Sequence, residues 1–265
     1  MVVDNRAGAA TIIAADYVQK SAPDGYTLLI GTSTTFVVNP IIYPKIPYNA
    51  LTSFDPVGVV GSAGLALLVN AANVKAHTLP ELVADMKAHP NTFSYGSHGN
   101  GSTVHFAAEM LWNAAHLKDV THIPYKGSAP AITDLSGGQI PIAFDAIPAA
   151  GAAAKGGRIR ILAVTSEKRS ALMPDVPTIA ESGYPGFKMT SWFGIVGPKN
   201  MPADVKAKLE KALAETVNDP AIAKRLEASG FDTKWTPSAQ YPALVKADTA
   251  DLAPIAKANN ITASN

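Results

Sequence analysis

The chain has 265 residues, of which 47% are hydrophobic and 16% are charged. Domains usually contain about 100–200 residues, so this length suits two domains with separate cores. The 22 Lys and Arg residues nearly balance the 21 Asp and Glu residues, for a formal net charge of +1. This balance, without a basic run, argues against nucleic-acid binding, and the hydrophobic content excludes a disordered chain.

Cysteine is absent, which excludes disulfides, thiolate nucleophiles and cysteine-bound zinc. The longest apolar stretches fall short of the ~20 residues of a membrane-spanning helix, so we expect a chain that does not cross a membrane. Met1 is followed by VVDNRAGAATI, which lacks the basic start and long apolar stretch of a signal peptide.

Short apolar runs alternate with helical patterns, and Gly and Pro, 20 of each, separate them. In chain order, we predict strands at 26–31, 56–60, 65–70, 93–97, 121–125, 139–145, 159–165 and 193–198. We predict helices at 11–21, 79–89, 102–117, 129–137, 177–183, 202–218, 220–230 and 237–259. This alternation is typical of an α/β protein, and the unbroken apolar strands favour parallel sheets.

The middle of the chain contains its own set of strand and helix units. The apolar runs before and after it (LALLVN and SWFGIVGP) could be paired crossings between two domains. We therefore predict a discontinuous domain 1 made of residues 1–66 and 190–265, and a domain 2 made of residues 67–189.

A loop rich in glycine and hydroxyl groups follows the predicted strand 93–97. It contains Ser97, Gly101, Ser102 and Thr103, and a helix is predicted to start within it. Glycine lets the backbone approach a ligand closely, and the N–H groups of a helix start attract an anion. The segment predicts a carboxylate or phosphate site; the alternative is that Ser102 only caps its helix. The loop does not fit GxGxxG, and GxxxxGK[ST] is absent, which argues against nucleotides.

Three further segments follow predicted strands. Thr32, Ser33 and Thr34 belong to a hydroxyl-rich run after strand 26–31, at the strand end where α/β sheets place ligands. An ST-turn or helix cap is the alternative there. Asp145 ends strand 139–145, where a buried carboxylate needs a partner: a ligand group, a nearby loop or the following segment. Tyr125 and Lys126 offer an aromatic face and a cation, although Lys126 could be an ordinary solvated lysine.

The sequence contains two enzyme-like patterns. Ser102, His105 and Glu109 share a helical face and could be drawn as a hydrolase triad. The serine would then lie in the helix that carries its own base, and GxSxG is absent, so a hydrolase is the last alternative. His105 and Glu109 have metal-ligand spacing and His98 could join them, but we expect structural histidines and no metal site.

At this point the chain resembles the Bug family, the TctC-like solute-binding receptors of tripartite tricarboxylate transporters. The resemblance runs through VVDNRAGAATIIAADYVQKSAPDGYTLLIGTS (2–33), FDPVGVV (54–60), FSYGSHGNGSTVHFAAEM (93–110), IPYKGSAPAITDLSGGQIPIAFD (123–145), GGRIRILAVTSEKRSALMPDVPTIAESGYPGF (156–187) and SWFGIVGPKNMPADV (191–205). It implies a periplasmic binding protein of the Venus-flytrap kind, with two α/β domains, two crossing strands and one small organic acid in the cleft.

The resemblance also assigns residues to the ligand. It implies Thr32, Ser33 and Thr34 on a first-domain loop, and Asp145 near the distal end of the ligand. On the second domain it implies a loop and helix start formed by Ser97, Gly101, Ser102 and Thr103, and a cleft segment with Tyr125 and Lys126. The family has a strand, a glycine loop and a helix before the segment with which this chain begins. We therefore expect an N-terminally incomplete domain 1 and a weaker affinity than that of a longer chain.

The predicted function is the reversible capture of a small carboxylate in the periplasm and its delivery to membrane transporter subunits. A dicarboxylate, an aromatic carboxylate and an amino acid all fit, and no catalytic residue, cofactor or nucleic acid is expected. A monomer suits such a receptor. The alternative from another class is a ligand sensor for a two-component signalling system.

Overall fold

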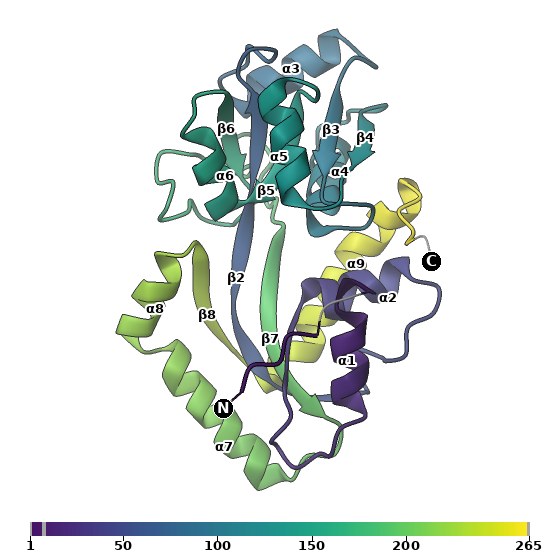
Figure 1. The fold of residues 1–265 in the computed structure, drawn as a ribbon, viewed down its shortest axis with the longest axis vertical. Coiled ribbons are helices and arrows are strands. Elements are labelled where there is room, and N and C mark those ends of the chain that lie inside the picture. The colour runs from purple at the N-terminus through teal and green to yellow at the C-terminus, as the bar shows by residue number, and fades with distance from the viewer. Residues whose placement is uncertain (1, 7–8, 264–265) are drawn as a thin grey trace. The chain divides into compact units, whose positions relative to one another are not determined.

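The structure is a computed structural model that describes residues 2–6 and 9–263 (Figure 1). The chain divides into two compact units. Unit 1 comprises residues 1–62, 191–226 and 232–265, and unit 2 comprises residues 63–190 and 227–231. The predicted domain boundaries stay a prediction.

The elements of unit 1 come from the N-terminal and the C-terminal parts of the chain. Apart from single residues at element ends, they are η1 (Ala9–Thr11), α1 (Ile12–Gln19), β1 (Leu29–Thr32), the π-helical η2 (Thr34–Val38), α2 (Asn39–Ile42), β7 (Thr190–Pro198), α7 (Ala203–Val217), α8 (Pro220–Glu227), β8 (Phe231–Pro237), η3 (Ser238–Gln240) and α9 (Tyr241–Ala258). The long strand β2 (Phe54–Asn70) begins in unit 1 and ends in unit 2.

Unit 2 is otherwise built from the middle of the chain. Its elements are α3 (Leu79–Ala88), β3 (Ser94–Ser97), α4 (Thr103–Ala114), β4 (Thr121–Pro124), α5 (Ser128–Gly137), β5 (Ile142–Ala146), α6 (Ile147–Ala154) and β6 (Ile159–Val164). Local signals account for several of them. At α3, the Thr78 hydroxyl accepts the Glu81 N–H at 3.3 Å and thereby caps the helix.

The described strands form one mixed sheet in the order β1-β7-β2-β5-β3-β4, with β6 and β8 also paired with β2. β3 pairs in parallel with β4 and β5, whereas β2 is antiparallel to β5 and β6, and β1 is antiparallel to β7. The α/β class is confirmed, but the expected parallel arrangement holds for only part of the sheet. β2 enters unit 2 directly from unit 1, so no crossover helix requires it to run parallel to its neighbours.

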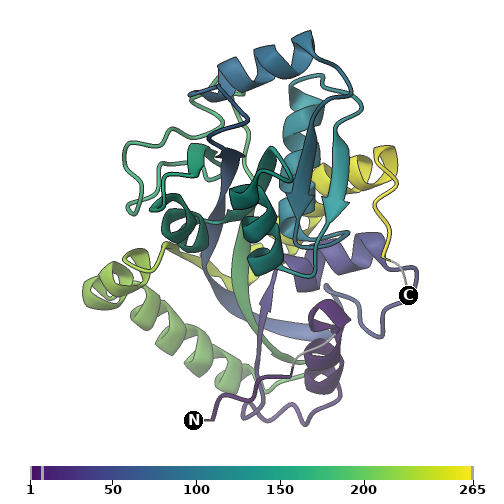
Figure 2. The same ribbon diagram turned by 45° about the horizontal axis from the view of Figure 1, so that its top comes forward.

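The core of unit 2 lies on both faces of β5. Ala143 belongs to a buried cluster with Leu135 of α5 and Ala150 of α6. The next residue, Phe144, contacts Trp112 of α4, with ring centroids 6.1 Å apart. Successive strand residues point to opposite faces, and Figure 2 shows α5 and α6 on one side of these strands and α4 on the other. The buried residues IAFD therefore fill both layers.

An aromatic cluster organises the core of unit 1. The Phe36 and Trp192 rings stack at 5.8 Å, and Tyr241 packs edge-on against both. The Trp192 Nε1–H donates to Asp248 Oδ2 at 2.6 Å, which satisfies the indole N–H inside the unit.

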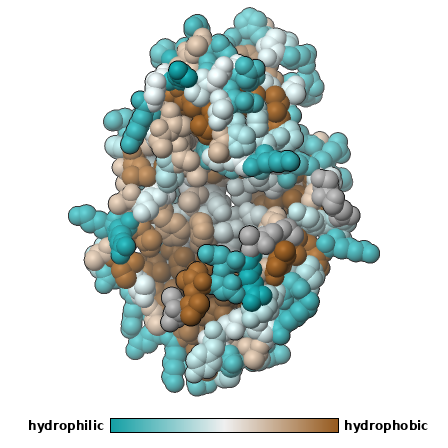
Figure 3. All heavy atoms as spheres, in the orientation of Figure 1, coloured by the Kyte–Doolittle hydropathy of each residue, from teal (hydrophilic) through white to brown (hydrophobic). Residues whose placement is uncertain are grey.

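By contrast, α7 buries only Val217 and α8 buries no residue. On the face drawn in Figure 3, hydrophobic residues gather over β8.

Several segments differ from the predicted elements. The runs 56–60 and 65–70 form one strand, β2, because the small residues between them continue the extended chain. The predicted helix 177–183 is wrong: the Ile179 N–H donates to the Val164 oxygen at 2.8 Å, so this segment pairs with the end of β6 instead. η2 with α2, α6 and β8 were not predicted. No helix among the described residues is long and apolar enough to span a membrane.

Candidate functional site

The hydroxyl-rich run of unit 1 lies where β1 passes into η2. Thr32 and Thr34 are partly exposed, whereas Ser33 is buried and its hydroxyl lies 3.5 Å from that of Ser191 on β7. The centre of this segment is Thr35, which is fully buried. Its Oγ1 accepts the Thr32 N–H at 3.2 Å and shares a hydrogen bond with Thr11 Oγ1 at 2.8 Å.

Thr35 was not among the predicted site residues. Thr35 is more deeply buried than the other hydroxyl residues of the run, and the sequence does not reveal this difference. Its carbonyl oxygen also accepts the Tyr48 hydroxyl at 2.7 Å. Thr35 therefore holds the segment in place, and the partly exposed Thr32 and Thr34 are the predicted residues here that solvent reaches.

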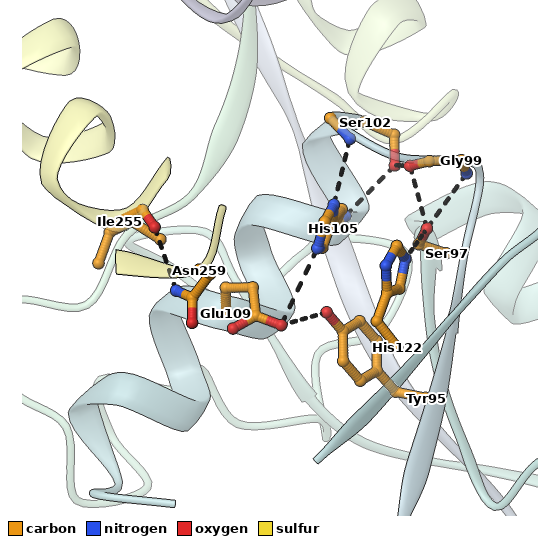
Figure 4. A network of polar contacts seen from close by, with 10 residues as sticks. Tyr95, Ser97, Gly99, Ser102, His105, Glu109, His122, Ile255 and Asn259 are labelled. Atoms are coloured by element: carbon orange, nitrogen blue, oxygen red, sulfur yellow. Dashed lines mark hydrogen bonds and ion pairs between the residues drawn. The ribbon is translucent and has the colours of Figure 1, made fainter. Parts of the chain in front are cut away.

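The glycine-rich loop of unit 2 is closed by its own side chains (Figure 4). The buried Ser97 hydroxyl contacts both the N–H and the oxygen of Gly99 at 3.1 Å. The Ser102 hydroxyl donates to the Gly99 oxygen at 2.8 Å and accepts the His105 N–H at 3.3 Å. Ser102 therefore caps α4 in the way that the capping interpretation expects.

The contacts at the start of α4 show which backbone N–H groups already have a hydrogen-bond partner. The Gly101 N–H donates to His105 Nδ1 at 3.1 Å, and the His105 N–H is taken by Ser102. The N–H groups of Thr103 and Val104 lie in the first turn, where a helix provides no partner of its own. They carry the positive end of the helix dipole and can donate hydrogen bonds to a carboxylate without a formal cation.

Asp145 joins three segments of unit 2. Its side chain is 2% exposed. One carboxylate oxygen accepts the Ala146 N–H at 2.7 Å, and the other accepts the Ser128 hydroxyl at 2.5 Å at the start of α5. His98 Nε2 lies 3.3 Å from the same oxygen, without hydrogen-bond geometry. Asp145 thus has hydrogen-bond partners at two helix starts and a close neighbour on the glycine-rich loop.

Tyr125 and Lys126 differ in their surroundings. The half-buried Tyr125 donates its hydroxyl to Asp134 Oδ2 at 2.7 Å. Burial, together with this hydrogen bond, raises the pKa of Tyr125 to about 12, so the phenol stays protonated at neutral pH. The ring also lies beside Gly96, where a Cβ atom would come within 3.1 Å of it. Lys126 is exposed, as a solvated lysine would be.

A buried titratable cluster lies beneath the glycine-rich loop and was not predicted as a unit from the sequence. The His105 and His122 rings stack with centroids 3.8 Å apart, and Tyr95 stacks on His122 at 5.0 Å. Tyr95 donates its hydroxyl to Glu109 (Figure 4). Tyr95 and His122 are register partners on the parallel strands β3 and β4, a pairing that no local sequence pattern reveals.

Burial shifts every titratable group of this cluster toward its neutral form. It lowers the pKa of His122 to about 4 and, with the nearby His122, lowers the pKa of His105 to about 3. It raises the pKa of the Glu109 carboxyl and of the Tyr95 phenol. At neutral pH both imidazoles are therefore uncharged.

This geometry bears on the hydrolase alternative. A serine nucleophile needs an imidazole nitrogen within hydrogen-bond reach. The Ser102 hydroxyl instead contacts the Gly99 oxygen and the backbone of His105, while His105 Nδ1 is occupied by Gly101. Among the described residues, no group of three His, Cys, Asp or Glu residues could hold a metal ion.

Comparison with known proteins gives a family for the chain. The family model described as "Tripartite tricarboxylate transporter family receptor", TctC, matches residues 1–261. BugT of Bordetella pertussis is 36% identical over 231 residues, which cover 87% of this chain and 70% of BugT. A UPF0065 protein from the tcbD-tcbE intergenic region of Pseudomonas sp. strain P51 is 35% identical over 234 residues, or 88% of this chain and 69% of that protein.

Solved structures resemble the chain over nearly its whole length. The R. palustris protein Rpa4515 with adipate has a TM-score of 0.84 and 32% identity, covering 98% of this chain and 87% of that one. The periplasmic binding protein BugD has a TM-score of 0.78 and 31% identity, with the same coverage. MatC from Rhodopseudomonas palustris with bound malate has a TM-score of 0.74 and 26% identity, covering 94% and 85%.

These likenesses confirm the predicted fold class, a two-domain periplasmic binding protein. The fold and the family are those of solute-binding receptors rather than enzymes. With a family model matched over residues 1–261 and relatives above 30% identity, the chain belongs to the TctC family of tripartite tricarboxylate transporter receptors, to which the Bug proteins are related.

Proposed function

We propose that this protein is a periplasmic solute-binding protein that captures a small organic carboxylate and delivers it to the membrane subunits of a tripartite tricarboxylate-type transporter. The family match and the similar proteins solved with adipate and malate support this function. The observation that carries the ligand chemistry is the start of α4, where the first-turn N–H groups of Thr103 and Val104 can bind a carboxylate.

The charges around this helix start favour recognition by N–H groups and hydroxyls. Lys126 is exposed. The carboxylate of Asp145 is occupied by Ser128 and Ala146, and a second ligand carboxylate placed beside it would be repelled. A dicarboxylate therefore binds with one carboxylate at α4 and the other away from Asp145.

Ten residues stay assigned to ligand binding as part of this proposal. They are Thr32, Ser33, Thr34, Ser97, Gly101, Ser102, Thr103, Tyr125, Lys126 and Asp145. The buried contacts of Ser97, Ser102 and Asp145 give these three a supporting role in shaping the loop. The proposal also includes a monomer whose domains comprise residues 1–66 with 190–265, and 67–189.

A thermal-shift screen tests the ligand class. The panel contains adipate, malate, benzoate, glutamate and inorganic phosphate. At about 100 times its dissociation constant, a ligand stabilises the folded protein by about 2.7 kcal/mol, which shifts Tm by a few degrees. We expect a shift with at least one carboxylate and none with phosphate. A shift with phosphate alone, or with no compound of the panel, would contradict a carboxylate receptor.

A matched pair of variants tests the helix start itself. Thr103→Pro removes the N–H at the first helical position together with the Thr103 hydroxyl. Proline is well tolerated at this position, and Ser102 before it already has extended backbone angles. Thr103→Ala keeps the N–H and removes the hydroxyl. Calorimetric titration should show at least about a tenfold affinity loss for Thr103→Pro and less for Thr103→Ala. Equal affinity of Thr103→Pro and the wild-type protein would exclude this N–H as a ligand donor.

A further inference from the structure

The glycine-rich loop of unit 2 is held at its C-terminal end by an imidazole nitrogen. Gly101 is buried and has a φ of +72°, a left-handed conformation that favours glycine. Its N–H donates to His105 Nδ1 at 3.1 Å. This bond joins the turn before α4 to the first turns of the helix itself.

The contact determines where the proton of His105 is. A nitrogen that accepts a hydrogen bond carries no proton, so neutral His105 has its proton on Nε2. Nε2 faces Glu109, with 3.9 Å between Nε2 and Oε1. The same carboxylate oxygen accepts the Tyr95 hydroxyl, which fixes the position of Glu109 (Figure 4). Glu109 and Tyr95 thus favour the tautomer that can hold Gly101.

The second imidazole of the cluster holds the other end of the loop. His122 Nε2 lies 2.6 Å from the Ser97 hydroxyl, which in turn contacts Gly99. The two rings stack within an interplanar angle of 17°, so a shift of either ring displaces the other. Side-chain exposure is only 5% for His105 and 13% for Glu109, which protects these contacts from competition with water.

We propose that His105 is the positioning residue of the ligand loop: its unprotonated Nδ1 holds the Gly101 N–H and thereby keeps the N–H groups of Thr103 and Val104 in place for a ligand carboxylate. His105 does not itself touch the ligand, because its Nδ1 is occupied and its Nε2 faces Glu109. The part of this inference that concerns the ligand rests on the proposed function, whereas the part that concerns the loop does not.

Two isosteric variants separate the two ring nitrogens. The amide oxygen of His105→Asn reaches the position of Nδ1 and can still accept from Gly101. The longer side chain of His105→Gln reaches the position of Nε2 and cannot. We expect His105→Asn to lose about threefold in affinity for adipate and His105→Gln about tenfold or more, as calorimetric titration measures. Equal losses for both variants would overturn the proposal.

Two measurements without ligand keep the loop test independent of the proposed function. In the wild-type protein, the imidazole ¹⁵N NMR spectrum should show His105 as the neutral Nε2–H tautomer at pH 7. The Gly101 amide should exchange slowly in the wild-type protein and in His105→Asn, and at least about tenfold faster in His105→Gln. A protonated Nδ1, or the same exchange rate in both variants, would contradict the positioning role.

The outcomes distinguish the two hypotheses. If the wild-type protein binds no carboxylate of the panel but the Gly101 amide responds as expected, the proposed function fails and the loop-holding role stands. If adipate binds but the variants do not differ in amide exchange, the receptor function stands and the inference is wrong. The Tm of each variant shows whether a loss of affinity comes from unfolding. Glu109→Gln, which keeps an acceptor for the Tyr95 hydroxyl, is measured in the same way as a second variant.

Discussion

Each unit of the molecule has a strand that runs into a hydroxyl-rich segment and then a helix, but the two segments are held in different ways. In unit 1, the buried Thr35 hydroxyl binds the Thr32 backbone and the Thr11 hydroxyl. In unit 2, two imidazoles hold the loop, one through Ser97 and one through Gly101. Similar hydroxyl-rich segments are therefore held in place by neutral hydroxyl groups in unit 1 and by titratable imidazole rings in unit 2.

This difference indicates which of the two units should be sensitive to pH. A hydroxyl network keeps its hydrogen-bonding capacity across the physiological pH range because serine and threonine do not titrate there. An imidazole acceptor works only while it is unprotonated. Burial keeps His105 and His122 unprotonated at neutral pH. In acid the folded protein loses stability because the unfolded chain takes up protons that these buried imidazoles exclude.

Acid should destabilise the protein mainly through unit 2. Above pH 6.5, His105 is neutral in both the folded and the unfolded state. As the pH falls from 6.5 toward 4, the unfolded state takes up a proton that the folded state excludes, because burial lowers the folded pKa to about 3. By pH 4, His105 alone should reduce the free energy of unfolding by about 3 kcal/mol.

Urea denaturation of the wild-type protein and of His105→Asn at pH 7 and pH 4 measures this effect. Glu109, whose pKa is raised by burial, acts in the opposite direction, and His122 acts in the same direction. Both groups, and Tyr95, are present in both proteins, so their contributions largely cancel in the difference. The wild-type protein should lose more stability than the variant; equal losses would show that His105 does not titrate as a buried group.

Tyr95→Phe should weaken the support of unit 2 at neutral pH. The substitution removes the hydroxyl that donates to the buried Glu109 carboxyl and leaves the ring in place. A lost hydrogen bond to a carboxyl group costs about 1.5–3 kcal/mol, and chemical denaturation at pH 7 measures the loss. Tyr26→Phe is the control, because Tyr26 is 94% exposed. A similar effect of the two substitutions would contradict the Tyr95–Glu109 pairing.

Thr35→Val tests the hydroxyl support of unit 1. Valine has nearly the shape of threonine, so the substitution mainly removes the acceptor of the Thr32 N–H and the partner of Thr11. We expect the free energy of unfolding to fall by about 1–2 kcal/mol. Thr34→Val, a change of the partly exposed neighbour, should stay within about 0.5 kcal/mol. The loss in Thr35→Val should be the same at pH 7 and pH 5, which separates this support from that of unit 2.

Ser102→Ala should have the smallest effect. It removes the cap of α4, which costs about 1 kcal/mol in typical helices. Ser102→Asn keeps a capping oxygen and should recover most of that stability in the same thermal unfolding experiment. If Asn fails to restore what Ala removes, the role of Ser102 lies in its bond to the Gly99 oxygen rather than in the cap.

Features that depend on residues close together in the chain could be predicted from the sequence. The alternation of strands and helices predicted the α/β class. The sequence also indicated capping by Ser102 as the alternative to ligand binding, because a cap is recognised within four residues. The family resemblance spans most of the chain, and the comparisons confirm it. The two hydroxyl-rich segments were located because they follow predicted strands, while their role in ligand binding stays a proposal.

Contacts between residues that lie far apart in the chain are seen only in the folded structure. The stacking of His105 with His122 and Tyr95 depends on the parallel pairing of β3 with β4, and the partners of Asp145 depend on how β5 packs beside α5 and the glycine-rich loop. The same holds for the segment 177–183, whose backbone pairs with β6 instead of forming a helix. Strand register and burial arise from contacts between residues far apart in the chain, and local sequence patterns carry little information about either.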